Sequence, residues 1–418
     1  RPGSMAKLQP ARGTHDLMPA DMRRHRAVGD AARRVAGLYG FDEIATPIFE
    51  FSDVFRRTLG DTSDIVTKEM YTFVDKGGEE ITLRPENTAG VVRAVLSGGL
   101  LQQGPLKYFY FGPMFRYERP QKGRQRQFHQ IGIELITVPE PLGDVEVIAC
   151  GWAVLRALGC ADKVTLELNT LGDGESRAAY REALVSYLRG HLASLSADSQ
   201  ARLERNPLRI LDSKDEGDRR IVADAPRFDA FLTPAAREFF ARVRGDLDAL
   251  GLPYRLNPRL VRGLDYYCHT AFEFTTEALG AQGTVMGGGR YDGLIAEMGG
   301  PPSHGVGWAA GVERLAMLLA AEPPAPRPVA MVPMGEKAEA AALALADRLR
   351  GEGLRVELGY RGNLKRRLEV ANKRNARAAV ILGEDELARG AAAVKDLDTG
   401  EQSEVALDQL GARLAQLR

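Results

Sequence analysis

Hydrophobic positions change their spacing several times along the chain, and each change predicts a different kind of element. Residues 21–39 carry apolar side chains at helical spacing, and residues 41–51 then become rich in β-type side chains around Pro47. Short β-type runs fill residues 70–136, and no helical crossover separates the last two, LKYFYFGPMFRYE and RQFHQIGIELI. Strands joined without a crossover pair antiparallel, so this region is predicted to form an antiparallel sheet.

The segment RPQKGR between those two runs is polar and basic, and Gly123 permits a tight turn there. The two runs are therefore predicted to form a long hairpin whose tip is positively charged and faces solvent. From about residue 174 to residue 250 the pattern becomes helical, which indicates a helical insertion. β-type runs return in LVRGLDYYCHTAFEFTT and TVMGGGRYDGL, so the sheet is predicted to be completed after the insertion.

The stretch EPPAPRP at residues 322–328 holds four prolines in seven residues and is interpreted as a stiff linker. Beyond it, VAMVPM, LRVELGY and ARAAVILG alternate with helical segments, and VKDLDTGEQSEV has the pattern of a hairpin. The predicted fold class is α+β: an antiparallel-sheet domain over residues 5–325 with the helical insertion, then a small doubly wound α/β domain over residues 326–418. The native chain is expected to begin at Met5, the first methionine.

Length and composition set limits on the function. A chain of 418 residues exceeds one ordinary hydrophobic core, which favours two or three domains. Basic and acidic side chains are equal in number, 56 of each, so an RNA partner would have to bind a local basic patch. The three cysteines form no CxxC pair, so neither a metal site nor disulfides are predicted. No apolar run reaches the length of a signal peptide or a membrane span, so a cytoplasmic protein without membrane contact is expected.

The hairpin FRYERPQKGRQRQFHQIGIE carries the most informative side chains. Arg116 and Glu118 lie two apart, which would place them on one face of a strand, and Arg124 would return on the partner strand. A guanidinium can bind a phosphate, and a carboxylate can accept a hydrogen bond from an amino group such as that of adenine. A solvated ladder of cross-strand ion pairs is the alternative.

On the returning strand, Gln130 and Glu134 share a face, and Gly132 between them has no side chain to obstruct a ligand. A glutamate inside the apolar run IGIELI is costly to bury without a partner, which favours a pocket floor over the alternative of a surface-facing acid. In LRPENTAG, Glu86 and Thr88 lie two apart after a strand, although Thr88 could equally be a helix N-cap.

The segment VRGLDYY brings together a cation, an acid and two phenols that can orient a polar ligand: Arg262, Asp265, Tyr266 and Tyr267. Tyrosines in β-type segments are otherwise ordinary core residues. The glycine run GGGR at residues 287–290 suggests close approach of backbone, and alone it is weak evidence for a phosphate loop.

These motifs together resemble the class II aminoacyl-tRNA synthetases. FRYE with the returning RQFHQIGIE is similar to their motif 2, GVGWAAGVERL to motif 3, and Pro47 in IATPIFE to the motif 1 proline. LRPENTAG, VRGLDYY and GGGRYDGL resemble the histidyl-tRNA synthetase family in particular, and the resemblance runs from about Gly13 to the C-terminal end.

The resemblance implies an enzyme that activates histidine with ATP to histidyl-adenylate and then transfers it to the 3′ end of histidine tRNA. It implies Arg116, Arg262 and Arg314 as catalytic residues, because guanidinium groups stabilise charge that develops on the phosphates. ATP would contact Arg116, Glu118, Arg124 and Arg314, with Glu118 at adenine and Arg314 at the γ-phosphate. Magnesium is expected on the β- and γ-phosphates, from nucleotide chemistry, and no metal ligands are assigned in the chain.

Histidine recognition is assigned by the same resemblance. Glu86, Thr88 and Gln130 would hold the α-amino group, and Glu134 with Tyr267 would hold the imidazole, whose two nitrogens need one donor and one acceptor. The full set of expected histidine contacts is Glu86, Asn87, Thr88, Gln130, Glu134, Arg262, Tyr266 and Tyr267.

Basic residues cluster in the C-terminal domain, with Leu364, Leu368 and Ala371 expected on the opposite, buried helix face. The cluster comprises Arg361, Lys365, Arg366, Arg367, Lys373, Arg374 and Arg377. Solvated helix charge is one interpretation. The resemblance to an anticodon-binding domain favours the other, in which Arg361, Lys365, Arg366, Lys373 and Arg374 bind tRNA.

Motif 1 resemblance also implies a homodimer. Two rival functions share the catalytic motifs: a non-catalytic histidine-sensing regulatory subunit of histidine biosynthesis, and a synthetase for threonine or proline. The retained arginines and the second domain argue against the first rival, and VRGLDYY argues against the second.

Overall fold

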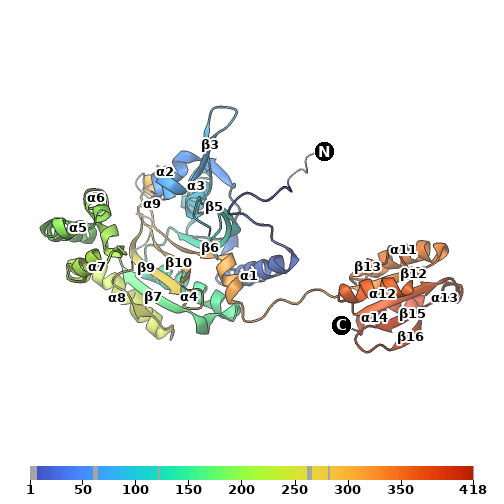
Figure 1. The fold of residues 1–418 in the computed structure, drawn as a ribbon. Coiled ribbons are helices and arrows are strands. Elements are labelled where there is room, and N and C mark those ends of the chain that lie inside the picture. The colour runs from blue at the N-terminus through green and yellow to red at the C-terminus, as the bar shows by residue number, and fades with distance from the viewer. Residues whose placement is uncertain (1–6, 60–64, 121–122, 261–265, 281–282, 418) are drawn as a thin grey trace, which may run out of the picture. The chain divides into compact units, whose positions relative to one another are not determined.

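The computed structural model describes residues 7–59, 65–120, 123–260, 266–280 and 283–417 (Figure 1). The chain forms two compact units, Arg1–Pro323 and Pro324–Arg418, and each is described by itself. Among the described residues, no helix is both long enough and apolar enough to cross a membrane. Arg262 and Asp265 lie outside the described residues.

An eight-stranded sheet forms the centre of the first unit, with strand order β1-β5-β6-β11-β10-β9-β7-β8. The neighbours from β5 to β7 in this order are all antiparallel, and the short strands at the two edges add parallel pairs, so the predicted antiparallel sheet is confirmed. The strands are β1 (Asp42–Glu43), β5 (Leu106–Phe115), β6 (Gln127–Ile136), β7 (Thr165–Thr170), β8 (Arg255–Leu256), β9 (Cys268–Thr275), β10 (Thr284–Arg290) and β11 (Gly305–Gly311).

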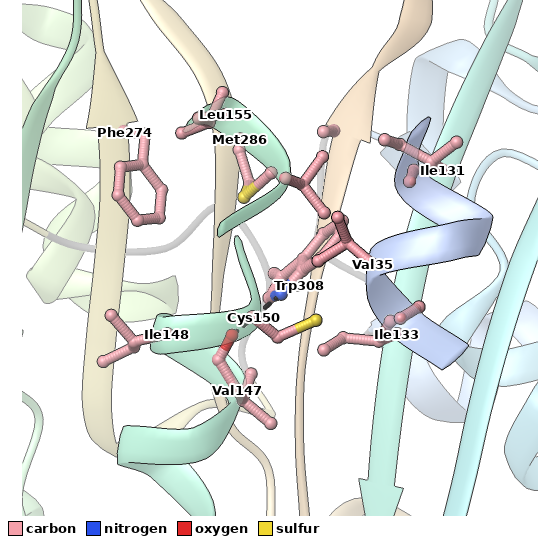
Figure 2. Packing of buried hydrophobic residues seen from close by; sticks show 14 of the residues in the cluster. Val35, Ile131, Ile133, Val147, Ile148, Cys150, Leu155, Phe274, Met286 and Trp308 are labelled. Carbon is pink, nitrogen blue, oxygen red and sulfur yellow. Dashed lines mark hydrogen bonds between the residues drawn. The ribbon is translucent and has the colours of Figure 1, made fainter. Parts of the chain in front are cut away.

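One face of the sheet packs against helices through a large apolar core (Figure 2). Val35 and its helical neighbours point into this core, as the spacing predicts, and Ile131 and Ile133 enter it from β6. The Trp308 indole donates a hydrogen bond of 3.0 Å to the carbonyl of Val147, so its one polar group is satisfied. The covering helices are α1 (Pro19–Leu38), α4 (Pro141–Ala157), α8 (Pro234–Ala249) and α10 (Val312–Leu318).

The opposite face is covered by a second apolar cluster that includes Tyr110 of β5, Ile136 of β6 and several tyrosines. Alternation along β6 sends Gln130, Gly132 and Glu134 to this side, because successive side chains of a strand point to opposite faces. The covering helices are α2 (Ser52–Leu59), α3 (Thr88–Ser97) and α9 (Leu294–Glu297), with a π-helical turn η1 (Ile65–Glu69) and a 3-10 turn η2 (Leu100–Gln103).

A separate three-stranded sheet has the order β2-β4-β3. Its inner face is polar: the hydroxyl groups of Ser52 and Thr82 lie 2.7 Å apart, and those of Thr72 and Thr82 lie 2.9 Å apart. Its outer face exposes Phe49 and Phe51. The strands are β2 (Phe49–Phe51), β3 (Tyr71–Val74) and β4 (Glu80–Leu83).

The predicted helical insertion forms a small core of its own, around Tyr180, Leu184 and Leu188. Within it, the Asp218 carboxylate accepts hydrogen bonds from three serine hydroxyls, those of Ser196, Ser199 and Ser213. The last predicted insertion helix, α8, instead contributes Val243 and Leu247 to the core of the main sheet. The insertion elements are α5 (Gly174–Gly190), α6 (Ala197–Arg205) and α7 (Glu216–Ala223), with 3-10 turns η4 (Leu192–Ser194), η5 (Pro207–Asp212) and η6 (Phe228–Phe231); η3 (Ala161–Lys163) precedes β7.

The second unit is a five-stranded sheet of order β13-β12-β14-β15-β16, with parallel pairs among the first three strands and antiparallel pairs in the last two. Apolar clusters cover both of its faces, as expected of a doubly wound unit, and the predicted hairpin is formed by β15 and β16. The elements are β12 (Val329–Met334), α11 (Glu336–Gly351), β13 (Val356–Leu358), α12 (Leu364–Lys373), β14 (Ala378–Gly383), α13 (Glu384–Ala388), β15 (Ala391–Asp396), β16 (Gln402–Ala406), η7 (Leu407–Gln409) and α14 (Leu410–Ala415).

Candidate active site

A cavity of about 240 Å³ opens on the face of the large sheet that α3 covers. Its lining contains ten of the residues singled out from the sequence: Glu86, Thr88, Arg116, Glu118, Arg124, Gln130, Glu134, Tyr266, Tyr267 and Arg314. These residues come from segments far apart in the chain, and the sheet order brings them together. Glu134 lies among hydroxyl groups of the lining, and Glu118 lies beside Arg116 and Arg124.

Glu134 is the central acid of this cavity, with only 1% of its surface exposed. Its carboxylate accepts hydrogen bonds from the Thr88 hydroxyl at 2.7 Å and the Tyr291 hydroxyl at 2.5 Å, and a longer one from Tyr110 at 3.5 Å. A side chain at Gly307, on the neighbouring strand, would collide with the carboxylate. The site therefore depends on a glycine at that position.

Sequence reasoning missed Tyr110 and Tyr291, which both line the cavity. The space above Gly132, interpreted as room for a ligand, is filled by the phenol of Tyr110, because Tyr110 pairs directly with Gly132 across the hairpin. The hairpin register could have revealed this pair. Nothing in the sequence relates Tyr291 to Glu134, since 157 residues separate them.

Burial raises the pKa of Glu134 from 4.5 to about 8, and the hydrogen bonds from Tyr291 and Thr88 oppose this rise. Burial is also the largest cause that raises the pKa values of Tyr110 and Tyr291 well above 10. A carboxyl group with this raised pKa, surrounded by neutral phenols, can both donate and accept hydrogen bonds.

We expect the parent protein to lose stability relative to a Glu134→Gln variant as pH rises. The folded-state pKa of about 8 lies above the unfolded value of 4.5, so the contribution of Glu134 is fully present below pH 4.5 and is lost as pH approaches 8. The loss should be on the order of a few kcal/mol. Urea denaturation of both proteins at several pH values between these limits would measure it. A constant difference between the two proteins would contradict the raised pKa.

Glu86 lies two residues before the start of α3. Its carboxylate accepts hydrogen bonds from the backbone N–H groups of Thr88 (2.6 Å) and Ala89 (3.1 Å), so Glu86 satisfies the helix N-terminus. The alternative prediction, in which Thr88 is the N-cap, is wrong, because the Thr88 hydroxyl donates to Glu134 instead. Asn87 does not line the cavity: its side-chain oxygen accepts hydrogen bonds from Thr46 and Arg84 and belongs to a neighbouring structural network.

Arg116, Glu118 and Arg124 lie beyond the end of the hairpin ladder, and their predicted position on the strands is wrong. The regular ladder ends at Phe115. The backbone N–H of Arg116 still donates to the carbonyl of Arg126 at 2.9 Å, and the backbone N–H of Tyr117 donates to the carbonyl of Glu69 at 2.7 Å. The three residues nevertheless converge in the loop, where Arg124 pairs with Glu118 at 3.3 Å. Among the described residues, the ladder of ion pairs considered as an alternative is reduced to the local pairs of Glu118 with Arg124 and Arg116.

The guanidinium of Arg116 is held in place from one side. Its Nε donates to the carbonyl of Pro85 at 2.8 Å, and its carbon lies 5.2 Å from the centre of the Phe128 ring. One of its terminal nitrogens lies 3.9 Å from the Glu118 carboxylate, and Arg116 lines the cavity. A fork fixed in this way can bind an anion with little loss of side-chain entropy.

Arg314 lies in the first turn of α10 and donates to the carbonyl of Thr284. Tyr266 and Tyr267 pack ring against ring with centroids 4.6 Å apart, and both are nearly fully buried. Arg177, from the insertion, donates to the Tyr267 carbonyl at 2.8 Å and so links the insertion to the cavity wall.

The glycine run at residues 287–290 serves sheet packing. A side chain at Gly288 would collide with the backbone of β11, so the close approach of backbone expected from the run occurs between neighbouring strands. Arg290, the last residue of the run, is fully buried and forms an ion pair with Asp144.

A second, larger cavity of about 560 Å³ extends between the insertion and the sheet. It shares Tyr267 with the first cavity, and sequence reasoning did not anticipate it. Six arginines line it: Arg177, Arg209, Arg227, Arg237, Arg244 and Arg259. Several aromatic rings lie among them, a combination that suits phosphodiester backbone and stacked bases.

In the second unit, Arg361, Lys365, Arg366, Lys373 and Arg374 are all exposed on or beside α12. Two predictions about this helix are wrong. Leu364 is 37% exposed, and Arg367 points inward, where it donates to the carbonyls of Pro333 and Gly362. The reason is the helical register: Arg367 lies one turn before the buried Ala371 and therefore shares its face.

Among the described residues, one group of side chains is close enough to share a metal ion: His25, His129 and Glu313, whose nearest ligating atoms lie within 4.8 Å of one another. In this structure the Glu313 carboxylate is hydrogen-bonded to His129.

Comparison with known proteins identifies the family. The family model of histidyl-tRNA synthetase matches residues 13–315, and the model of an anticodon binding domain matches residues 328–417. The chain belongs to the histidyl-tRNA synthetase family. A histidine–tRNA ligase of Gluconacetobacter diazotrophicus is 64% identical to this synthetase over 413 residues, which cover 99% of this chain and 100% of that protein.

Solved structures agree with this family. The apo histidyl-tRNA synthetase of S. aureus is 34% identical, with a TM-score of 0.82 over 97% of this chain and 99% of that one. A protein of Bacillus halodurans described as an ATP phosphoribosyltransferase regulatory subunit/histidyl-tRNA synthetase has a TM-score of 0.65 at 21% identity, over 91% of this chain and 99% of that one. The second likeness shows a shared fold. The family and fold class predicted from the sequence motifs are thus confirmed.

Proposed function

We propose that this synthetase is a histidine–tRNA ligase: it activates histidine with ATP and transfers the histidyl group to the 3′ end of histidine tRNA. The observation that carries the proposal is the composition of the cavity: its lining contains a buried acid with phenols, and also three arginines. The acid and phenols suit an imidazole, and the arginines suit a polyphosphate. High identity to a histidine–tRNA ligase over the whole chain supports the same function.

In the activation step, a histidine carboxylate oxygen attacks the α-phosphorus of ATP and forms a new O–P bond. The bond from the α-phosphorus to the bridging oxygen breaks, and pyrophosphate leaves with that oxygen. Negative charge accumulates on the phosphate oxygens, so fixed cations aimed at them lower the barrier. We assign this role to Arg116 and, by family resemblance, to Arg262. Arg314 holds the γ-phosphate, Arg124 lies on the pyrophosphate side, and ATP enters as its magnesium complex.

Glu118 is assigned to the adenine amino group. Its carboxylate is engaged by Arg124 at 3.3 Å and lies 3.9 Å from Arg116, so the same two cations that face the phosphates also orient the acid. One oxygen of a carboxylate can accept from the adenine amino group while the other remains with a guanidinium.

The amino-acid end of the cavity offers groups for both ends of histidine. The side-chain oxygen of Gln130 is buried and has no hydrogen-bond partner in the described part of the chain. Such an acceptor is costly unless a ligand satisfies it, which supports Gln130 and Glu86 as partners of the α-ammonium group. Glu134 and Tyr267 then take the two imidazole nitrogens, and Thr88 acts by orienting Glu134.

Transfer to RNA requires the amino-acid cavity to meet the 3′ end of the tRNA while a distant part of the RNA is held elsewhere. The arginine-lined second cavity adjoins the first at Tyr267, which supports it as the path of the acceptor end. The exposed cations on α12 are assigned to the anticodon region, because cations that bind phosphates supply affinity for an RNA loop whose unpaired bases can be read. We place the protein in the cytoplasm, where its free thiols Cys150, Cys160 and Cys268 stay reduced.

Pyrophosphate exchange with single amino acids tests the proposal directly. Histidine should support exchange of labelled pyrophosphate into ATP, and threonine and proline should not, because neither can satisfy the buried acid and phenol. A protein that binds histidine without exchange would instead match the regulatory subunit. Exchange that depends on threonine or proline would overturn the assigned substrate.

We further propose a homodimer through the outer face of the three-stranded sheet. Phe49, Phe51 and Phe73 are about half exposed there, and in the sheet register Phe51 and Phe73 both pair with Ile81. A contiguous apolar face of this kind is typical of a protein interface. No second chain is needed to explain the polar inner face, which is satisfied by its own hydroxyls.

A double variant, Phe51→Glu with Phe73→Glu, should shift the protein to monomers, because two charges would be buried on each side of a symmetric interface. Sedimentation velocity would measure the mass. The matched control replaces Leu192 and Leu250, exposed apolar residues away from this sheet, with glutamate. The interface is misplaced if the phenylalanine variant stays dimeric or if the control dissociates equally.

A further inference from the structure

The carboxylate of Glu313 joins helix α10 to strand β6, and each of these elements carries a residue of the active site. Glu313 lies at the start of α10, directly before Arg314, and His129 lies on β6, directly before Gln130. The backbone N–H of His129 donates to both oxygens of Glu313 at 3.0 Å, and His129 Nδ1 lies 2.9 Å from Oε1. Because a carboxylate only accepts, Nδ1 carries the proton in this contact.

The end of a strand explains why the contact is needed. β11 pairs with β6 as far as Gly311 opposite Gln130, and the chain then turns into α10. The next outward N–H of β6, that of His129, therefore has no carbonyl of β11 to donate to. Glu313 supplies the acceptor in its place and fastens the first turn of the helix to the strand.

The His129 ring is held from both sides. His25 of α1 packs edge-on against it with centroids 5.3 Å apart, and Phe111 of β5 stacks on it at 6.2 Å. Burial lowers the pKa of His25, although Glu313 and Asp21 oppose that shift while His129 and His15 reinforce it. His25 thus stays neutral near pH 7 and does not compete as a cation for the carboxylate.

We propose that Glu313 is a positioning residue for the activation step: through His129 it fixes where Arg314 lies relative to Gln130. The inference rests on the proposed function, which gives Arg314 the γ-phosphate and Gln130 the α-amino group. Glu313 itself lines the cavity, yet a free carboxylate beside a polyphosphate would repel it. Its side chain is only 13% exposed and both oxygens are engaged, which is what a positioning role requires.

The same three side chains offer two imidazoles and a carboxylate, which form a ligand set that zinc accepts. Nδ1 of His25 is buried without a hydrogen-bond partner in the described part of the chain. A metal would, however, have to replace the hydrogen bond between Nδ1 of His129 and Oε1 of Glu313, which is already well formed. The hydrogen-bonded arrangement is therefore favoured, and metal binding becomes one outcome of the test.

The test measures pyrophosphate exchange, with KM values for ATP and histidine, in the full-length protein. Glu313→Ala should raise the KM for ATP by about tenfold or more, because hydrogen bonds to a charged group are lost. Glu313→Gln should stay within about threefold of the parent, since its oxygen still accepts from the backbone N–H and its amide can donate to the other tautomer of His129. His129→Phe, which keeps the backbone contact, should give an intermediate value.

A double-mutant cycle with Arg314→Ala separates a positioning role from an independent one. If Glu313 acts through Arg314, adding Glu313→Ala to Arg314→Ala should change the KM for ATP by less than about twofold. The matched control is His304→Asn, which removes another histidine–carboxylate pair, His304 with Asp292 at 3.2 Å, outside the cavity lining. This control should behave like the parent.

Four results would overturn the inference. In the first, Glu313→Ala has the kinetics of the parent while Arg314→Ala is impaired, which leaves the proposed function intact. Parent-like kinetics of Arg314→Ala would instead count against the proposed function itself. Additive effects in the cycle would show that Glu313 acts on its own. The role would be merely structural if Glu313→Ala lowered kcat, raised both KM values by similar factors and lowered the melting temperature, and if Glu313→Gln showed the same defects. Zinc retained at one ion per chain after dialysis, and lost in His25→Phe, would show a metal site.

Discussion

Replacing Arg116 with alanine is expected to slow pyrophosphate exchange by about 10² to 10³ and to leave the fold intact. The guanidinium is fixed by the carbonyl of Pro85 and the ring of Phe128, so it is ready for charge that develops in the transition state. An interaction of this kind affects kcat more than the KM for histidine. Stopped-flow or exchange kinetics at saturating histidine would measure the loss.

Arg119→Ala is the matched control for Arg116. It removes an exposed arginine from the same loop, outside the cavity lining, and should change exchange by less than about twofold. Arg116→Lys tests the fork itself, because a lysine keeps the charge and loses the Nε contact with Pro85. If Arg116→Ala exchanged at nearly the parent rate, the catalytic role assigned to this arginine would be wrong.

A fragment of residues 5–323, which ends with the first compact unit, should form histidyl-adenylate normally and charge tRNA at least about 100-fold less efficiently than the full chain. The cavity residues all precede this end, whereas the exposed cations on α12 follow it. Binding through fewer phosphate contacts releases fewer counterions. The slope of the logarithm of tRNA affinity against the logarithm of salt concentration should therefore weaken by about 0.7 to 0.9 for each lost contact. Aminoacylation and exchange assays over a salt series would measure both effects.

The fragment needs two controls, one for folding and one for charge. Sedimentation and thermal unfolding must show that it keeps the oligomeric state of the parent. In the full chain, Lys365→Gln with Arg366→Gln should weaken aminoacylation of tRNA. Replacing Arg348 and Arg389, exposed cations elsewhere in the unit, with glutamine should leave aminoacylation unchanged. A folded fragment that charges tRNA as well as the parent would remove the RNA-binding role from the second unit.

Sequence pattern predicted the elements of this fold better than it predicted their contacts. Period-two and helical spacing, with the basic turn around Gly123, were enough for the hairpin, the insertion and the second α/β unit. The buried face of α12 was harder to predict. Arg367 is polar and so was expected on the surface, yet its long side chain turns inward and donates to buried carbonyls.

The candidate site divides in the same way. Charged and phenolic residues in recognisable motifs, such as Glu134 and Arg116, do line one cavity. Tyr110 and Tyr291 did not stand out, because aromatic residues in β-type runs are usually core. Tyr291 is also 157 residues from Glu134, whereas the hairpin register could have revealed Tyr110. Asn87 shares the motif of its neighbours, yet its amide is turned to Thr46 and Arg84, a direction that only tertiary structure determines.

The place of β11 in the large sheet has a consequence for how the protein is made. This strand, Gly305–Gly311, lies between β6 and β10, both of which leave the ribosome earlier. Until it is synthesised, two apolar strands have open edges in the middle of the future sheet, and such edges favour aggregation. A nascent chain stalled before residue 305 should therefore bind chaperones and should not bind ATP. ATP binding should appear only after β11 has been synthesised and has joined the sheet. The large sheet and the active site are therefore completed in the same step, when β11 pairs with β6 and β10.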